Sequence, residues 1–185
     1  MKKVMIVIGH SFKDRGCNKK IENFIITEYD ICMEVATRLF SIDTTEDIDI
    51  VLKSRNHSYT DLPKEINSYN PDYIIELHLN SSDNKDVQGT EHLYYHTSKR
   101  SKQMATILQN NCIKEFGYKD RGIKPIKQGD RGCNILLNTK APCVIAEPFF
   151  LSYDNKGKLV LINDLINKYC SYLQNSIREI VDKNV

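Results

Sequence analysis

Two histidines and a glutamate stand at the ends of three strand-like segments of this sequence. Each lies within or just after an apolar run: His10 follows residues 3–8, His78 lies in residues 73–79, and Glu147 ends residues 143–147. In open α/β sheets, ligands bind in a crevice outside the carboxyl ends of the strands. The three side chains are therefore predicted to converge on one crevice.

A second glutamate, Glu28, falls among apolar residues that recur at three- and four-residue steps. Those residues are Ile21, Ile25, Cys32, Val35 and Leu39. The spacing predicts a helix of about five turns that starts near residue 21 and ends before Ser41. Glu28 lies on the apolar face, where an unpaired charge costs several kcal/mol or more. Its carboxylate therefore needs a cation, a hydrogen-bonded partner or a strongly raised pKa.

Two imidazoles and one carboxylate are a common ligand set for catalytic zinc, and they leave the fourth tetrahedral position open. Bound zinc polarises a carbonyl and lowers the pKa of its water to about 7, while a nearby carboxylate relays the proton to the leaving amine. We therefore predict one zinc ion per chain, with Glu147 as the base. Each of the four residues alone would also fit a structural role. Their occurrence together in such positions favours a catalytic site.

The elements that must position these residues alternate between strand and helix. Further strands are predicted at residues 48–52 and 90–95, and helices at residues 60–69, 98–116 and about 159–181. Residues 117–142 are predicted to be irregular. This alternation predicts an α/β fold with a single domain, residues 1–185. Its mainly parallel twisted sheet is flanked by helices, and the active site lies at the carboxyl ends of the strands.

Composition narrows the classes of function. With 26 basic and 24 acidic residues the net charge is +2, which gives no field that would indicate a nucleic-acid partner. The apolar run that starts at Val4 is too short for a signal peptide or a membrane span. The six cysteines form no C-x-x-C pair, so we expect free thiols, with Cys32, Cys112 and Cys170 buried. These features predict synthesis in the cytoplasm without a signal peptide.

At these residues the sequence resembles the type 3 family of N-acetylmuramoyl-L-alanine amidases, which are zinc enzymes of bacterial autolysins and phage endolysins. The similarity covers nearly the whole chain. It is carried by the Gly9-His10 pair, the glutamate-bearing segment 23–38, the His-x-Asn strand 75–80, the Gly-Thr-Glu step 89–91, and residues 138–152. The last stretch, which contains Glu147, is the most specific.

The resemblance implies that the zinc ligands are His10, Glu28 and His78. It also implies that Glu147 is the base, and that the bond cut joins the lactyl group of N-acetylmuramic acid to L-alanine of the stem peptide. The sequence departs from the family at Glu76, where a small residue is common. By strand alternation Glu76 shares a face with His78, so it either supports that histidine from outside the ligand set or competes with Glu28 for the metal.

The expected partner is bacterial peptidoglycan. We assign Asn80, the asparagine of the His-x-Asn match, and Arg131 to substrate binding. Lys124 and Lys127 lie in the same basic stretch as Arg131, and all three basic residues could bind carboxylates of the stem peptide. The sequence has no room for the separate wall-binding module that the family often carries. We expect a monomer that does not bind nucleic acid or insert into membranes. It would reach the cell wall by release or lysis. A phage endolysin is the preferred interpretation, and a bacterial autolysin is the alternative.

Two other functions compete with this interpretation. Cys17 lies seven residues after His10, so the pair could form a cysteine hydrolase. Alternatively, the chain could be a non-catalytic wall-binding module that keeps the fold without turnover. A thiol reagent would inactivate a cysteine hydrolase, whereas a chelator would inactivate a zinc enzyme. Release of amines from cell walls would distinguish an amidase from a non-catalytic module.

Overall fold

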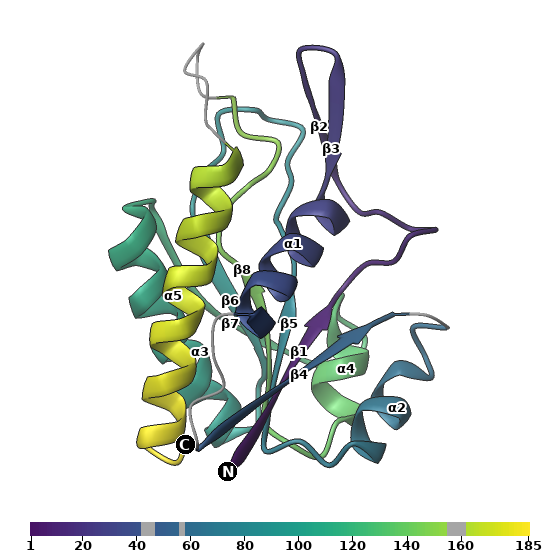
Figure 1. The fold of residues 1–185 in the computed structure, drawn as a ribbon, viewed down its shortest axis with the longest axis vertical. Coiled ribbons are helices and arrows are strands. Elements are labelled where there is room, and N and C mark those ends of the chain that lie inside the picture. The colour runs from purple at the N-terminus through teal and green to yellow at the C-terminus, as the bar shows by residue number, and fades with distance from the viewer. Residues whose placement is uncertain (42–46, 56–57, 155–161) are drawn as a thin grey trace.

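The computed structural model describes residues 1–41, 47–55, 58–154 and 162–185. Helices cover both faces of a six-stranded sheet (Figure 1). Its strands, in spatial order, are β4 (Ile48–Ser54), β1 (Lys2–Ile8), β5 (Tyr73–Leu77), β8 (Cys143–Glu147), β6 (Thr90–Tyr95) and β7 (Asp120–Ile126). The first four strands are parallel, whereas β6 is antiparallel to β8 and parallel to β7. The predicted α/β fold with a mainly parallel sheet is confirmed.

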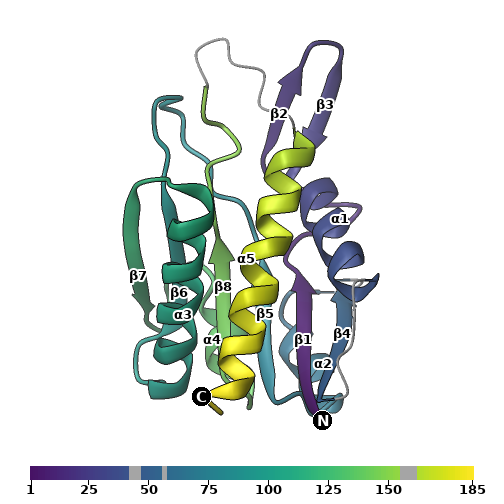
Figure 2. The ribbon, with the colours of Figure 1, turned by 60° about the vertical axis from the view of Figure 1, so that its left-hand side comes forward.

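The core has two apolar layers because successive side chains of a strand point to opposite faces of the sheet. On one face, Val4, Ile6 and Ile8 of β1 pack beneath α1 (Glu28–Ser41), α3 (Lys99–Phe116) and α5 (Ile162–Asp182). On the other face, Met5 and Val7 pack beneath α2 (Leu62–Ser68) and α4 (Cys133–Asn138). Figure 2 shows α2 and α4 on the opposite side of the sheet from α3 and α5. The central strands are therefore covered on both sides, as the strands of parallel sheets usually are.

Local sequence signals set the ends of the predicted helices. The Ser98 hydroxyl accepts a hydrogen bond from the backbone N–H of Ser101 at the start of α3, and Gly117 ends that helix with a φ of 65°. Pro63 lies in the first turn of α2, where its missing N–H costs little. The predictions of helices at 98–116 and 60–69 are confirmed. The last helix is described from Ile162, so the predicted residues 159–161 lie outside the described residues.

The predicted start of the first helix near residue 21 is wrong. Residues up to Thr27 form an antiparallel hairpin, β2 (Asn18–Ile21) and β3 (Phe24–Thr27), and α1 begins at Glu28. The reason is a reciprocal cap: the Asp30 carboxylate accepts from the Thr27 N–H at 3.0 Å, and the Thr27 hydroxyl accepts from the Asp30 N–H at 3.3 Å. The hairpin projects beyond the carboxyl ends of the sheet, and Ile25 is 67% exposed there.

The prediction that residues 117–142 are irregular is also wrong, because they contain β7 and α4. Strand β7 is an edge strand that includes Gly122 and Pro125, two residues that are unusual in strand interiors. Helix α4 has six residues, too few to show a helical period. Strand β7 and the turn of residues 130–132 that leads into α4 form one wall of the cavity described next.

Candidate active site

The carboxyl ends of β1, β5 and β8 bring the predicted residues together. His10 is two residues beyond the end of β1, His78 directly follows β5, and Glu147 is the last residue of β8. The ladder continues past β5, because the His78 N–H donates to the Ala146 carbonyl at 3.0 Å. All three side chains line one cavity of about 570 Å³. Their convergence, which the strand pattern predicted, is confirmed.

Two glycines allow the chain to pass close to the histidines. A β-carbon at Gly9 would overlap the His78 imidazole. At Gly16, φ is +71° and a β-carbon would lie 2.5 Å from Glu28 Oε2 and 2.7 Å from the His10 ring. The loop after β1 therefore fits over these side chains because both positions lack a side chain.

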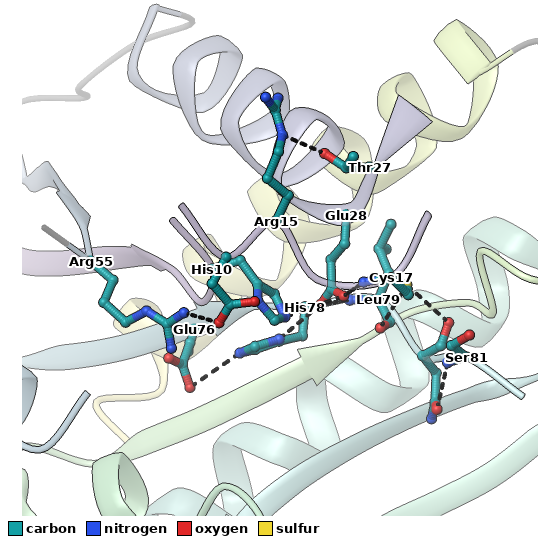
Figure 3. Close-up of polar contacts among 12 residues, drawn as sticks. His10, Arg15, Cys17, Thr27, Glu28, Arg55, Glu76, His78, Leu79 and Ser81 are labelled. Atoms are coloured by element: carbon teal, nitrogen blue, oxygen red, sulfur yellow. Dashed lines mark hydrogen bonds and ion pairs between the residues drawn. The ribbon is translucent and has the colours of Figure 1, made fainter. Parts of the chain in front are cut away.

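Glu28 reaches the histidines from the first residue of α1. Its Oε1 accepts from the Leu79 N–H and lies 2.8 Å from His78 Nδ1, while its Oε2 accepts from the Cys17 N–H at 3.1 Å. Oε2 also lies 3.3 Å from His10 Nε2 (Figure 3). Burial alone would raise the pKa of Glu28, but the neighbouring imidazoles of His10 and His78 hold it well below its usual range. The carboxylate is buried, as predicted, and these partners keep it charged.

His10, Glu28 and His78 offer one ligand atom each within 4.8 Å of one another. The two rings meet edge to face, with centroids 5.0 Å apart. Both ring nitrogens of His10 are buried and have no hydrogen-bond partner among the described residues. Burial would lower the pKa of His78, but the nearby carboxylates of Glu76 and Glu28 raise it to about 10. A cation between the three groups would satisfy the atoms that the chain itself leaves without partners.

Glu76 lies on the other side of His78 from Glu28. The Glu76 Oε2 atom is 3.6 Å from His78 Nε2, whereas Glu28 faces Nδ1 of the same ring. The two nitrogens of an imidazole point in different directions, so a metal bound through Nδ1 with Glu28 is turned away from Glu76. This geometry favours Glu28 over Glu76 as the ligand.

Glu147 belongs to a second polar cluster at the same cavity. It pairs across the antiparallel ladder with Glu91 of β6. The Asn80 amide nitrogen lies between their carboxylates and donates to Glu147 at 2.7 Å and to Glu91 at 2.5 Å. Arg121 Nε donates to the other oxygen of Glu91 at 2.7 Å. Burial raises the pKa of Glu147 to about 7; the charge of His78 opposes this rise and the Glu91 carboxylate adds to it. Glu147 can thus exchange a proton near neutral pH.

The basic residues of the cavity differ in their partners. Arg55 pairs with Asp14, and Arg121 pairs with Glu91. Lys124 lies 4.0 Å from Glu91. Arg131 lines the cavity, is exposed, and has no ion-pair partner within the described ranges. Lys127 does not line the cavity, although its backbone N–H donates to Asp130.

Cys17 lies near the site but lacks the features of a nucleophile. Its sulfur faces the carbonyl oxygens of Leu79 and Asn80 at 3.8 and 3.9 Å. Burial and then the neighbouring Glu28 carboxylate raise the pKa of the Cys17 thiol far above its usual range. A reactive cysteine needs the opposite shift, because the thiolate is the nucleophile. The geometry disfavours the cysteine-hydrolase alternative.

Comparisons with known proteins place this site in a family. A family model described as N-acetylmuramoyl-L-alanine amidase matches residues 4–179. The chain belongs to this family. Because the match extends from β1 to the last helix, it includes every ligand candidate and Glu147.

Relatives of this amidase family are similar to the chain at low identity. It is 24% identical to an endolysin of Bacillus phage SPP1 over 98% of this chain and 66% of the relative. It is 25% identical to the N-acetylmuramoyl-L-alanine amidase LytC of Bacillus subtilis strain 168 over 80% of this chain and 29% of the relative. The chain thus spans less than two thirds of both curated relatives. The fold matches the catalytic domain of CwlV, an N-acetylmuramoyl-L-alanine amidase from Bacillus (Paenibacillus) polymyxa var. colistinus, with a TM-score of 0.82, 24% identity, and coverage of 98% of this chain and 99% of CwlV.

Three residues of the amidase site had no role in the sequence-based prediction. Glu91 is part of the Gly-Thr-Glu step, but its contact with Asn80 depends on the register of β6 against β8. Asp14 and Arg55 lie on loops that are 41 positions apart in the chain. The position of Asp14 four residues after His10 was the available signal, because a carboxylate near a ligand histidine often supports it.

Proposed function

We propose that this chain hydrolyses the amide bond between N-acetylmuramic acid and L-alanine of bacterial peptidoglycan in a zinc-dependent reaction. The observation that carries the proposal is the placement of His10, Glu28 and His78 in one metal-binding group, on the same cavity as Glu147. Membership of the amidase family supports the reaction class.

The residues fit a zinc ion. Two imidazole nitrogens and a carboxylate oxygen are typical donors for a catalytic zinc site with an open position. Both nitrogens of His10 are buried and lack hydrogen-bond partners among the described residues, and coordination of a metal ion would satisfy one of them. We propose one zinc ion per chain at His10, Glu28 and His78. When bound, the ion supplies Lewis-acid polarisation of the scissile carbonyl and of the attacking water.

Glu147 supplies the proton transfers. With a pKa raised to about 7, its carboxylate can accept a proton from the attacking water and then donate it to the leaving L-alanine amine. The Asn80 amide holds the carboxylate toward the cavity, and Glu91 holds Asn80 from the other side. The predicted role of Asn80 in substrate binding would therefore include orientation of the base.

The stem peptide would meet the basic wall of the cavity. Arg131 lines this wall beside Glu147 and, unlike Arg55 and Arg121, has no carboxylate partner among the described residues. Its guanidinium can bind a carboxylate in bidentate geometry. We propose that Arg131 binds the free α-carboxylate of the acidic second residue of the stem peptide.

We propose an endolysin-like role in lysis of the cell wall. The similarity to a phage endolysin supports this role. No helix in the ranges that the structure describes is long and apolar enough to cross a membrane. We propose that release at lysis brings the protein to peptidoglycan.

The test is digestion of purified cell walls followed by analysis of the new chain ends. An amidase releases new amino-terminal alanine and creates no new reducing sugar ends. The Glu147→Gln variant is the matched control, because it keeps size and shape. Reducing ends or other amino-terminal residues would refute the proposal, whereas equal release by wild type and the variant would remove only Glu147 from the role of base. No release by a zinc-loaded wild type would instead support a non-catalytic wall-binding module.

A further inference from the structure

The two candidate zinc-binding histidines, His10 and His78, each have one carboxylate near either ring nitrogen. His78 faces Glu28 through Nδ1 at 2.8 Å and Glu76 through Nε2 at 3.6 Å. His10 faces Glu28 through Nε2 at 3.3 Å and Asp14 through Nδ1 at 3.5 Å. The shared Glu28 carboxylate thus marks the inner, metal-binding edge of both rings. The outer edges face two different carboxylates, one per histidine.

Glu76 is fully buried in the central strand β5. Neither carboxylate oxygen has a hydrogen-bond partner among the described residues. In the sheet it pairs with Val7 of β1 and Ile145 of β8, so its strand neighbours on both sides are apolar. An ionised carboxylate is costly to bury without a partner. The Glu76 carboxylate points toward His78 Nε2, 3.6 Å from its Oε2 atom (Figure 3), and a proton on that nitrogen would offset this cost.

Asp14 is held in place from two sides. Arg55, whose side chain is 14% exposed, donates to its Oδ2 atom. The turn from Ser11 to Asp14 is closed by backbone hydrogen bonds in both directions, at 2.9 and 3.2 Å. Although the Asp14 side chain is itself 60% exposed, it is therefore fixed beside His10 Nδ1.

We propose that Glu76 and the Asp14–Arg55 pair are positioning residues that accept the outer ring N–H of His78 and His10. They select the tautomers in which His78 offers Nδ1 and His10 offers Nε2 to the metal. This inference rests on the proposed zinc site and deepens it, because it assigns a role to each outer carboxylate. Partners of this kind usually change metal affinity about 10- to 100-fold.

The main test compares zinc affinity with stability for Glu76→Met and Glu76→Gln. Zinc dissociation constants are measured by competition with a chromogenic chelator, and melting temperatures are measured on the zinc-free proteins. We expect Glu76→Met to weaken zinc binding about 10- to 100-fold. Its zinc-free melting temperature should stay equal or rise, because His78 keeps Glu28 as a partner while an apolar side chain of similar shape replaces a buried carboxylate that makes no hydrogen bond. Glu76→Gln keeps an acceptor oxygen and should recover most of the affinity.

Asp72→Asn is the matched control on the same segment. Asp72 precedes β5 at the end of the sheet away from the site, where it accepts from the Lys3 N–H at 2.8 Å. This variant should lose stability and keep the wild-type zinc affinity. Asp14→Ala and Arg55→Met test the second outer group, and both should weaken zinc binding although both leave the three proposed ligands in place.

Three outcomes would overturn the inference. Glu76→Met could bind zinc as tightly as wild type, or lose it completely as we expect of Glu28→Ala, in which case Glu76 is itself a ligand. Ring ¹⁵N NMR of the zinc-loaded wild type reports the tautomers of His10 and His78 without any substitution. The opposite tautomers would also contradict the inference. Failure of the wild type to bind zinc would instead refute the proposed metal site, so the two failures are distinguishable.

Discussion

Replacement of Glu147 by glutamine removes the proposed proton acceptor and little else. The amide has nearly the same size, and the three proposed zinc ligands are untouched because Glu147 contacts Asn80 and not the ligand group. A positioned general base typically contributes about 10²- to 10⁴-fold to the rate. We therefore expect Glu147→Gln to bind zinc fully and to turn over about 10² to 10⁴ times more slowly.

The pH dependence of the wild type gives the same prediction a second readout. Glu147 acts as a base when it is deprotonated, so activity should rise with pH and level off above its pKa. Burial raises this pKa from 4.5 to about 7, and a bound cation lowers it. The acid limb of kcat/KM should therefore have its midpoint between 4.5 and 7.

The assay is release of amino-terminal alanine from purified cell walls, at several pH values, with zinc content measured in each sample. The residual activity of Glu147→Gln should lack the acid limb while zinc stays bound. Wild-type rates for a zinc-loaded Glu147→Gln would refute the reasoning. The base would then have to be sought among the other carboxylates of the cavity, with Glu76 first.

Three further predictions concern the substrate, the thiol and the metal. Arg131→Gln should raise KM about fivefold for stem peptides with a free α-carboxylate and leave amidated stems unchanged; equal effects on both substrates would contradict the assignment. Cys17→Ser should keep wild-type activity and iodoacetamide should not inhibit the wild type, whereas loss of activity in both experiments would revive the cysteine mechanism. At a free zinc concentration of about 100 times the Kd, bound zinc should stabilise the folded protein by about 2.7 kcal/mol. Removal of the zinc should therefore lower the melting temperature by roughly 5–10 °C. Identical melting curves with and without chelator would exclude a metal site in the folded protein.

The sequence was sufficient to predict the central strands and the convergence of the residues at their ends. Apolar runs of strand length are distinctive, and the parallel topology places their carboxyl ends at one edge of the sheet. His10, His78 and Glu147 could therefore be grouped before any coordinates were known. The helical spacing of apolar residues around Glu28 predicted that it is buried, although the helix that carries it starts later than this spacing suggested.

The helix start was missed because the apolar pattern of Ile21 and Ile25 continued through a hairpin. The pattern Thr27-x-x-Asp30 is a variant of the capping box and marks the true start at Glu28. Hydrophobic spacing alone cannot distinguish a short exposed hairpin from the first turns of a helix, whereas the cap can.

The outer contacts of the site depend on tertiary structure. Asp14 and Arg55 come from loops after different strands, and Glu91 reaches Asn80 through the antiparallel register of β6 against β8. No local pattern encodes such pairs, since each member looks like an ordinary polar loop or strand residue. Strand β7 was missed for a related reason, because an edge strand with Gly122 and Pro125 lacks the apolar alternation of a buried one.

The most direct test of the account is the zinc content of the purified protein and of its ligand variants. Elemental analysis should find about one zinc ion per wild-type chain and almost none in His10→Ala or His78→Ala, because each variant removes one of three protein ligands. The Asp72→Asn variant should retain the wild-type content. Full retention of zinc by both histidine variants would contradict the site at His10, Glu28 and His78.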